Sequence, residues 1–204
     1  MLIAKLFINA SKLIEKILTF FGMIGAWLAI PLIFVIIFDV ISRRFFVIGS
    51  TKLQEMEFHL HTALFLLVLG FAYIKNSHVR IEIVREKFST PIKAWLEVFG
   101  NILFLLPYTA MVIYYGIDFV SRSYNMNEVS AALTGLSHRW IIKSFLPFGM
   151  FLLWLAGISV LLRNIAYILG AEENNQEIMD KSLYISPELK NTELSEITKT
   201  NKID

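Results

Sequence analysis

Cysteine is absent from this 204-residue chain, and charged residues make up only 18% of it. The lack of cysteine excludes disulfides, thiolate metal sites, cysteine nucleophiles and cysteine-ligated clusters. Hydrophobic residues reach 56%, whereas soluble domains have about 45–50%. The net charge is only +2, and no compact basic stripe lies outside the connecting segments, so nucleic acid is not an expected partner. The composition indicates an integral membrane protein.

Recognisable catalytic motifs are also missing. The chain has no nucleophile elbow, no P-loop and no dinucleotide-binding fingerprint, so we do not expect an enzyme. Residues 1–85 and 86–170 do not resemble inverted repeats, which usually mark a self-sufficient transporter. These absences favour a subunit that needs a larger membrane partner.

The apolar residues fall into four blocks, and each block predicts a transmembrane helix. The first block runs from Ile17 to Phe38 without a charge, about 33 Å as a helix, which is enough to cross a bilayer. Pro31 lies inside it and is expected to kink the helix. The predicted fold is an all-α integral membrane protein with spans at about 17–38, 58–74, 95–117 and 144–162. Asp39 and Arg43, four residues apart after the first span, are expected to form an exposed ion pair. Lys143 and Arg163 bracket the last span.

The flanking segments predict the domain organisation and the orientation. Residues 1–16 carry Lys5, Lys12 and Lys16 among apolar residues and are expected to form an uncleaved amphipathic segment at the membrane surface. Residues 17–170 form the membrane domain, and 171–204 form an acidic, mobile tail. Part of the basic loop at 75–93 is also expected to form a short amphipathic segment in the lipid headgroups. The positive-inside rule places both termini in the cytoplasm.

The second span has an unusual polar start, with Gln54, Glu55, Glu57 and His61 close to its apolar part. The apolar residues of 58–74 favour insertion by roughly 3–6 kcal/mol in total, and one deep carboxylate costs roughly 3 kcal/mol. Glu55 and Glu57 must therefore lie at the membrane interface, or be paired or protonated against another helix.

The residue types of this cluster suggest three chemical roles. His59 and His61 diverge by about 200° on a helix, so they cannot chelate one metal ion. Haem ligation by His59 or His61 together with His138 needs axial ligands at matching depth. A proton relay through Glu55, Glu57 and His61 is a third possibility. We prefer polar packing against a partner subunit or the lipid headgroups.

Several segments together resemble the small membrane subunit, or DctQ family, of tripartite ATP-independent periplasmic (TRAP) transporters. They are Leu53-Gln54-Glu55, Leu60-His61, Ala72-Tyr73 and His78-Val79-Arg80-Ile81-Glu82. Asp39 to Phe46 is similar to the end of the family's first span, and Gly135-Leu136 to Pro147 is similar to the entry of its fourth. The likeness covers about residues 15–168; the family usually has Asp where Glu82 stands.

The resemblance implies a scaffold subunit of a sodium-coupled importer in the bacterial inner membrane. A large multi-helix subunit would hold the sodium and substrate sites, and a periplasmic protein would deliver an organic anion, so this chain needs no cofactor of its own. Candidates for contact with the large subunit are Gln54, Glu55, Glu57 and His61, and candidates for contact with the binding protein are Arg43, Arg44, Arg122 and Arg139. Membrane lipids are the remaining partner.

Two other functions remain open at this point. A small haem-bearing cytochrome subunit would show a Soret band, and a stand-alone exporter would transport its substrate as a lone chain in liposomes.

Overall fold

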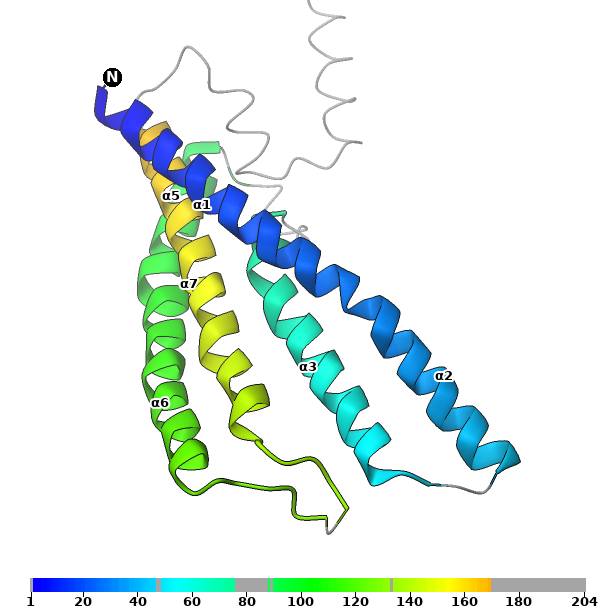
Figure 1. The fold of residues 1–204 in the computed structure, drawn as a ribbon. Helices are drawn as coiled ribbons and strands as arrows, with labels where there is room; N and C mark the ends of the chain where they lie inside the picture. Colours follow the sequence, from blue (N-terminus) through cyan, green and yellow to red (C-terminus); the bar gives the residue numbers. More distant parts are fainter. Residues whose placement is uncertain (1, 47–48, 76–87, 89, 133, 170–204) are drawn as a thin grey trace, which may run out of the picture.

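A computed structural model describes residues 2–46, 49–75, 88, 90–132 and 134–169 of the chain (Figure 1). Most of the basic loop, including the His78–Glu82 motif, lies outside these residues, and so does the acidic tail at 171–204. The described residues form helices joined by short connectors, without a strand among them. The predicted all-α fold is confirmed.

Four helices are long and apolar enough to cross a membrane. Helices α1 (Leu2–Trp27) and α2 (Ala29–Phe45) make up the first, and α3 (Thr51–Ile74) is the second. The third consists of α5 (Thr90–Gly100), the π-helix η1 (Asn101–Leu105) and α6 (Leu106–Asn125), and the fourth is α7 (Trp140–Ile168). The prediction of four membrane-spanning helices is confirmed. No described residue tests the predicted orientation of the termini.

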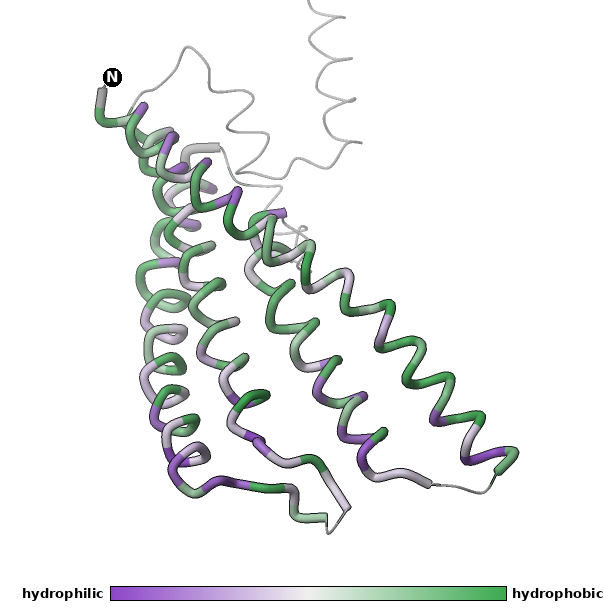
Figure 2. Tube along the Cα trace, in the orientation of Figure 1, coloured by the Kyte–Doolittle hydropathy of each residue, from purple (hydrophilic) through white to green (hydrophobic). Residues whose placement is uncertain are grey.

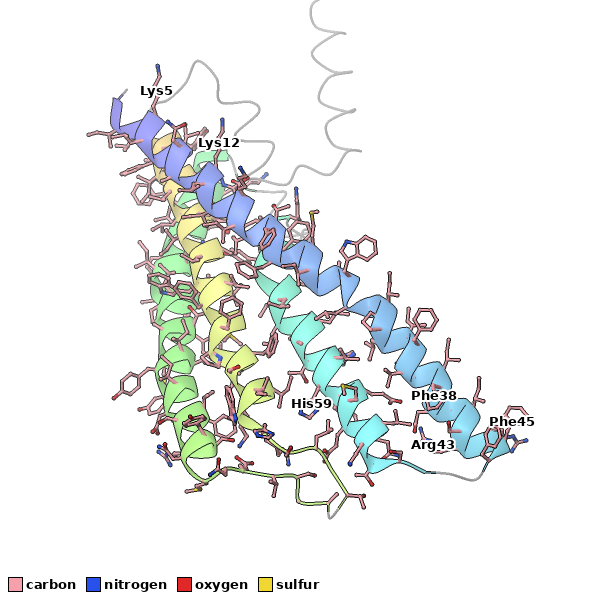
Figure 3. All side chains as sticks on the ribbon, viewed as in Figure 1. Lys5, Lys12, Phe38, Arg43, Phe45 and His59 are labelled. Atoms are coloured by element: carbon pink, nitrogen blue, oxygen red, sulfur yellow. The ribbon has the colours of Figure 1, made fainter. Side chains whose placement is uncertain are left out.

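The bundle has two ends of different composition. Helix α1 begins and α7 ends at one end, here called the terminal end, and the α2–α3 and α6–α7 connectors lie at the other, the connector end (Figure 1). Figure 2 shows apolar residues along the middle of the helices and polar residues gathered toward both ends. Lys5 and Lys12 project from α1 away from the bundle at the terminal end (Figure 3).

The first span is a nearly continuous helix. Helix α1 runs through residue 16 without a break, so the predicted amphipathic segment and the predicted span belong to one helix. The interruption falls at Leu28, whose N–H bonds to the carbonyls of Ile24 (3.2 Å) and Gly25 (3.1 Å). Pro31 has no N–H to offer the Trp27 carbonyl, and a proline perturbs the preceding turn in this way. The irregularity therefore lies one turn before the proline that causes it.

Helix α7 is the centre of the bundle and packs against α1, α3, α5 and α6. Close backbone approach to α3 depends on two glycines. A Cβ on Gly70 would lie 2.8 Å from the Leu152 carbonyl oxygen, and a Cβ on Gly149 would lie 2.7 Å from the Cβ of Leu66. Small residues at helix crossings are the usual means of tight packing in membranes. The α3–α7 contact is thus fixed by the sequence of both helices.

The third span contains a short π-helix just before Pro107. The missing N–H of Pro107 leaves the Leu103 carbonyl without its usual partner, and Leu103 lies within η1. Asn101, the first residue of η1, donates to the Glu97 carbonyl (2.9 Å) and accepts from the Tyr73 hydroxyl (3.1 Å). The irregular turn therefore carries a polar link between η1 and α3.

Helix α2 has far fewer neighbours than α7. Its contacts are mainly with α3, and of its seventeen residues only Leu32 and Asp39 are buried. The large apolar side chains on its other sides are exposed, among them Phe34 and Phe38. Helix α2 thus presents most of its surface to whatever surrounds the bundle.

Candidate functional site at the connector end

The connector loop, residues 126–139, is tied back on itself by main-chain hydrogen bonds. The Ser130 N–H donates to the Leu136 carbonyl (3.1 Å), and the Arg139 N–H donates to the Glu128 carbonyl (3.2 Å). Asn127 and His138 stand near its two ends with φ of 45° and 61°, a left-handed conformation that is uncommon for residues other than glycine. The described part of this connector is a folded element.

Glu55, in the second turn of α3, holds this loop against the bundle. One carboxylate oxygen accepts the Leu136 N–H at 2.6 Å, and the other accepts the Ser130 hydroxyl. Hydrogen bonds to a charged acceptor are stronger than those between neutral groups. We call Glu55, Ser130 and Leu136 the Glu55 clasp; it joins α3 to a loop more than seventy residues later in the chain.

Gly135 makes the clasp possible. A Cβ at this position would lie 2.2 Å from the Ser130 hydroxyl oxygen and 2.8 Å from a Glu55 carboxylate oxygen. Any other residue would push one of these groups away. The Gly135 N–H also donates to the Ala132 carbonyl (3.0 Å), which closes the turn beside the clasp.

A second contact fixes the loop to the start of α7. Glu128 and Lys143 form an ion pair, and the Lys143 ammonium lies 4.1 Å from the centre of the Phe119 ring, within the range of a cation–π interaction. The hydrogen bond from Lys143 holds the pKa of Glu128 below its ordinary value of 4.5. Glu128 is therefore ionised at neutral pH and links the loop to α6 and α7.

Two further carboxylates at this end pair within their own helices. Asp39 pairs with Arg43, and Asp118 pairs with Arg122. The Asp118 pair is exposed, but the Asp39 side chain is 0% exposed, which corrects the sequence-based expectation of an exposed Asp39–Arg43 pair. Within the described part of the chain, the second oxygen of Asp39 has no hydrogen-bond partner.

The profile of the family described as "Tripartite ATP-independent periplasmic transporters, DctQ component" matches residues 32–166, about two-thirds of the chain. The chain belongs to the DctQ family. No match was found among curated proteins. The matched range includes α3, the connector loop and most of α7, so the Glu55 clasp of this DctQ component lies within the matched residues.

The four residues expected to contact the large subunit fall into different environments. Glu55 bonds within the chain, through the clasp. Gln54 is half-buried and His61 is exposed. Glu57 has one carboxylate oxygen that is buried and lacks a hydrogen-bond partner among the described residues. His59 bonds through Nδ1 to the Glu55 carbonyl, rather than pairing with the carboxylate.

The four arginines expected to contact a binding protein all lie at the connector end of this DctQ component. Arg43 and Arg122 are paired with Asp39 and Asp118. Arg44 is exposed, and Arg139 is half-buried beside the loop. Their position in one region agrees with a shared surface, but two of the four have part of their charge matched inside the chain.

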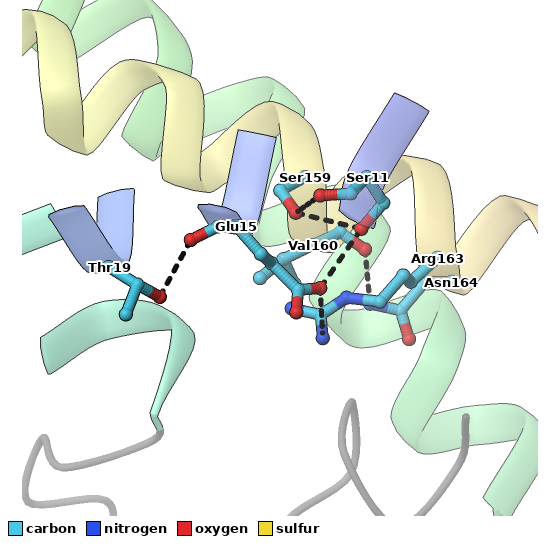
Figure 4. A network of polar contacts seen from close by, with 7 residues as sticks. All are labelled: Ser11, Glu15, Thr19, Ser159, Val160, Arg163 and Asn164. Atoms are coloured by element: carbon cyan, nitrogen blue, oxygen red, sulfur yellow. Dashed lines mark hydrogen bonds and ion pairs between the residues drawn. The ribbon is translucent and has the colours of Figure 1, made fainter. Parts of the chain in front are cut away.

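A polar network at the terminal end was not foreseen from the sequence (Figure 4). The Arg163 Nη1 lies 2.9 Å from a Glu15 carboxylate oxygen, and the hydroxyls of Ser11 and Ser159 are 2.8 Å apart. The sequence predicts Arg163 as the charged boundary of the last span, whereas its side chain is only 7% exposed. The overlooked signal is that Ser11 and Glu15, like Ser159 and Arg163, repeat at a spacing of four on otherwise apolar helices.

Among the described residues, no three His, Asp or Glu side chains are placed so that they could share a metal ion. The histidines of the connector end make other contacts: His138 Nδ1 lies 2.9 Å from the Ser137 hydroxyl. The chemistry of this site therefore suits it to hold the connector loop in place and to present a surface to a partner.

Proposed function

We propose that the chain is the small scaffold subunit of a sodium-coupled TRAP transporter that imports an organic anion across the bacterial inner membrane. It braces a large, DctM-like membrane subunit and helps a periplasmic binding protein to dock. In this proposal the terminal end faces the cytoplasm and the connector end faces the periplasm. DctQ membership and the four apolar helices support it.

The observation that carries the scaffold role is the sparse packing of α2. Only Leu32 and Asp39 of this helix are buried, and the helix contacts mainly α3. Exposed large side chains such as Ile33, Phe34 and Ile37 cover successive turns of the rest. A central helix such as α7 needs no further partner, whereas α2 offers a continuous apolar surface on which another membrane helix can pack.

The polar start of α3 lies beside this surface, because α3 is the main neighbour of α2. Glu57, with a carboxylate oxygen that lacks a donor among the described residues, together with Gln54 and His61, would complete the contact with the large subunit. The sodium and substrate sites, and therefore the selectivity for one anion, would belong to that subunit. No catalytic role and no cofactor is proposed for this chain.

Co-purification tests the scaffold role. The chain is expressed with a DctM-like large subunit, and the complex is isolated in mild detergent. Replacing Ile37 by Trp on α2 should reduce the recovered complex strongly, because a larger ring there blocks close helix packing while keeping the helix apolar. The matched control is Met111→Trp on α6, also at an exposed apolar position, which should leave recovery unchanged.

Two outcomes contradict the proposal. In the first, the chain elutes alone while uptake persists in cells that lack it. In the second, the lone chain reconstituted in liposomes transports an organic anion, which makes it a complete carrier.

A further inference from the structure

The connector loop exposes two apolar side chains beyond the end of a membrane span. Met126 is 77% exposed, more than any other large apolar residue in the described part of the chain, and Val129 is 62% exposed. Both follow the charged last turns of α6, where Asp118 pairs with Arg122. Their exposure leaves both side chains available for contact with a partner.

These two side chains are presented by a fixed backbone. The Glu55 clasp and the Ser130–Leu136 and Arg139–Glu128 hydrogen bonds secure the loop after Val129. On the other side, the Glu128 N–H donates to the Ser123 carbonyl at 3.0 Å. A surface that is already ordered loses little conformational entropy when a partner binds. Met126 and Val129 are thus held on an ordered backbone and are not part of a loose linker.

At the connector end, contacts within the chain satisfy most of the carboxylates. Asp39, Asp118 and Glu128 each pair with a basic side chain, and Glu55 is bonded within the clasp. Arg44 and Lys52 are exposed, and neither forms an ion pair with any described residue. Among the described residues Glu57 is also unpaired, but its free carboxylate oxygen is buried. The exposed unpaired charges of Arg44 and Lys52 are positive, and a face rich in carboxylates is complementary to them.

We propose that the connector loop is the docking element for the soluble substrate-binding protein, with Met126 and Val129 as its apolar contacts and Arg44 and Lys52 as its charged ones. The partner face that fits is a small apolar patch bordered by Asp and Glu. This inference rests on the function proposed above, because it requires a binding protein on the same side of the membrane as the connector end.

Site-specific cross-linking tests which partner touches the loop. The chain has no native cysteine, so Met126→Cys carries a single attachment point for a photoreactive maleimide. In the assembled complex with the large subunit in nanodiscs, illumination should link position 126 to the added binding protein. A probe at Met111→Cys, within the α6 span, is the control and should not. Transfer of the probe at 126 to the large subunit instead overturns the inference.

Affinity measurements separate this inference from the scaffold proposal. The complexes are immobilised in nanodiscs, and binding of the purified binding protein is measured. Complexes with the Met126→Ser/Val129→Ser double variant should bind it about tenfold or more weakly than the wild-type complex, as for apolar anchors at an interface. Arg44→Glu/Lys52→Glu should slow association and reduce its dependence on salt. Ala131→Ser, an exposed position in the same loop, is the control.

If the variants bind as tightly as the wild type while the complex stays assembled, the docking inference fails and the scaffold proposal stands. If no complex with the large subunit can be isolated, the scaffold proposal itself fails.

Discussion

The two ends of the bundle are held by polar contacts in opposite surroundings. At the terminal end, Arg163 and Glu15 join α7 to α1 with an arginine side chain that is only 7% exposed. At the connector end, Glu55 is half-buried, and both of its oxygens accept hydrogen bonds from one loop. The arginine of the ion pair is buried at the first end, whereas the Glu55 carboxylate is close to solvent at the second.

This difference decides what each contact contributes. A buried ion pair gains little over an apolar pair of the same size, but losing one partner leaves an uncompensated charge. Within the described part of the chain, Arg163 Nε and Nη2 have no hydrogen-bond partner, so Glu15 is its main compensation. A carboxylate near water loses less when a partner is removed, since solvent can replace it. Mutation of the ion pair at the terminal end should therefore destabilise the whole bundle, whereas mutation of Glu55 at the connector end should affect only the loop that it binds.

The largest effect is expected at Glu15. Glu15→Leu should lower the free energy of unfolding by about 3–5 kcal/mol, because Arg163 is left buried without its counter-charge. Unfolding by denaturing detergent measures the change.

The double variant Glu15→Leu/Arg163→Met is the control for this prediction. It should recover most of the lost stability, because it replaces the pair by apolar side chains of similar volume. Equal destabilisation in the single and double variants would show that the pair is not what holds α1 to α7.

The next effect is local and falls on the connector loop. Glu55→Ala removes the acceptor of the Leu136 N–H and the Ser130 hydroxyl. Amide hydrogen exchange at Leu136 should accelerate by roughly an order of magnitude, while exchange in α7 stays the same. Exchange that rises equally in both places would mean that Glu55 supports the whole bundle and not just the loop.

Gly135 tests the same clasp through its shape. Gly135→Ala places a methyl group 2.2 Å from the Ser130 hydroxyl oxygen, so the loop must shift, at a cost of about 1–3 kcal/mol in the free energy of unfolding. Adding Ser130→Ala removes the clashing oxygen and should recover part of that loss. If Gly135→Ala is silent in thermal unfolding, the loop does not pack as closely as described.

The sequence predicted the helices better than the polar contacts, and the physical reason is clear in particular residues. Long charge-free runs predict spans because bilayer thickness fixes their length. The Glu55 clasp joins residues some eighty positions apart, and no local period encodes such a pairing. The place of Arg163 after the last apolar run predicts a membrane boundary, because a charge is expected to face water; only the three-dimensional structure brings Glu15 beside it.

Acid should weaken the connector end in a defined direction. The pKa of Glu128 lies below its ordinary value because Lys143 donates to its carboxylate, so the folded protein holds this proton less tightly than the unfolded chain does. The stabilisation is fully present above pH 4.5 and is lost as the pH falls through the lowered pKa. Thermal midpoints of the wild type and of Glu128→Gln should therefore converge in acid; a constant difference at every pH would exclude the pair as its source.

The smallest effect is expected for the exposed pair of Asp118 and Arg122. Their side chains are 51% and 71% exposed, so solvent already screens the attraction. Arg122→Gln should shift the thermal midpoint by less than about 1 °C, the behaviour of a typical exposed i,i+4 pair. A shift as large as that of Glu15→Leu would mean that solvent exposure does not separate the two ends, and the contrast between them would no longer hold.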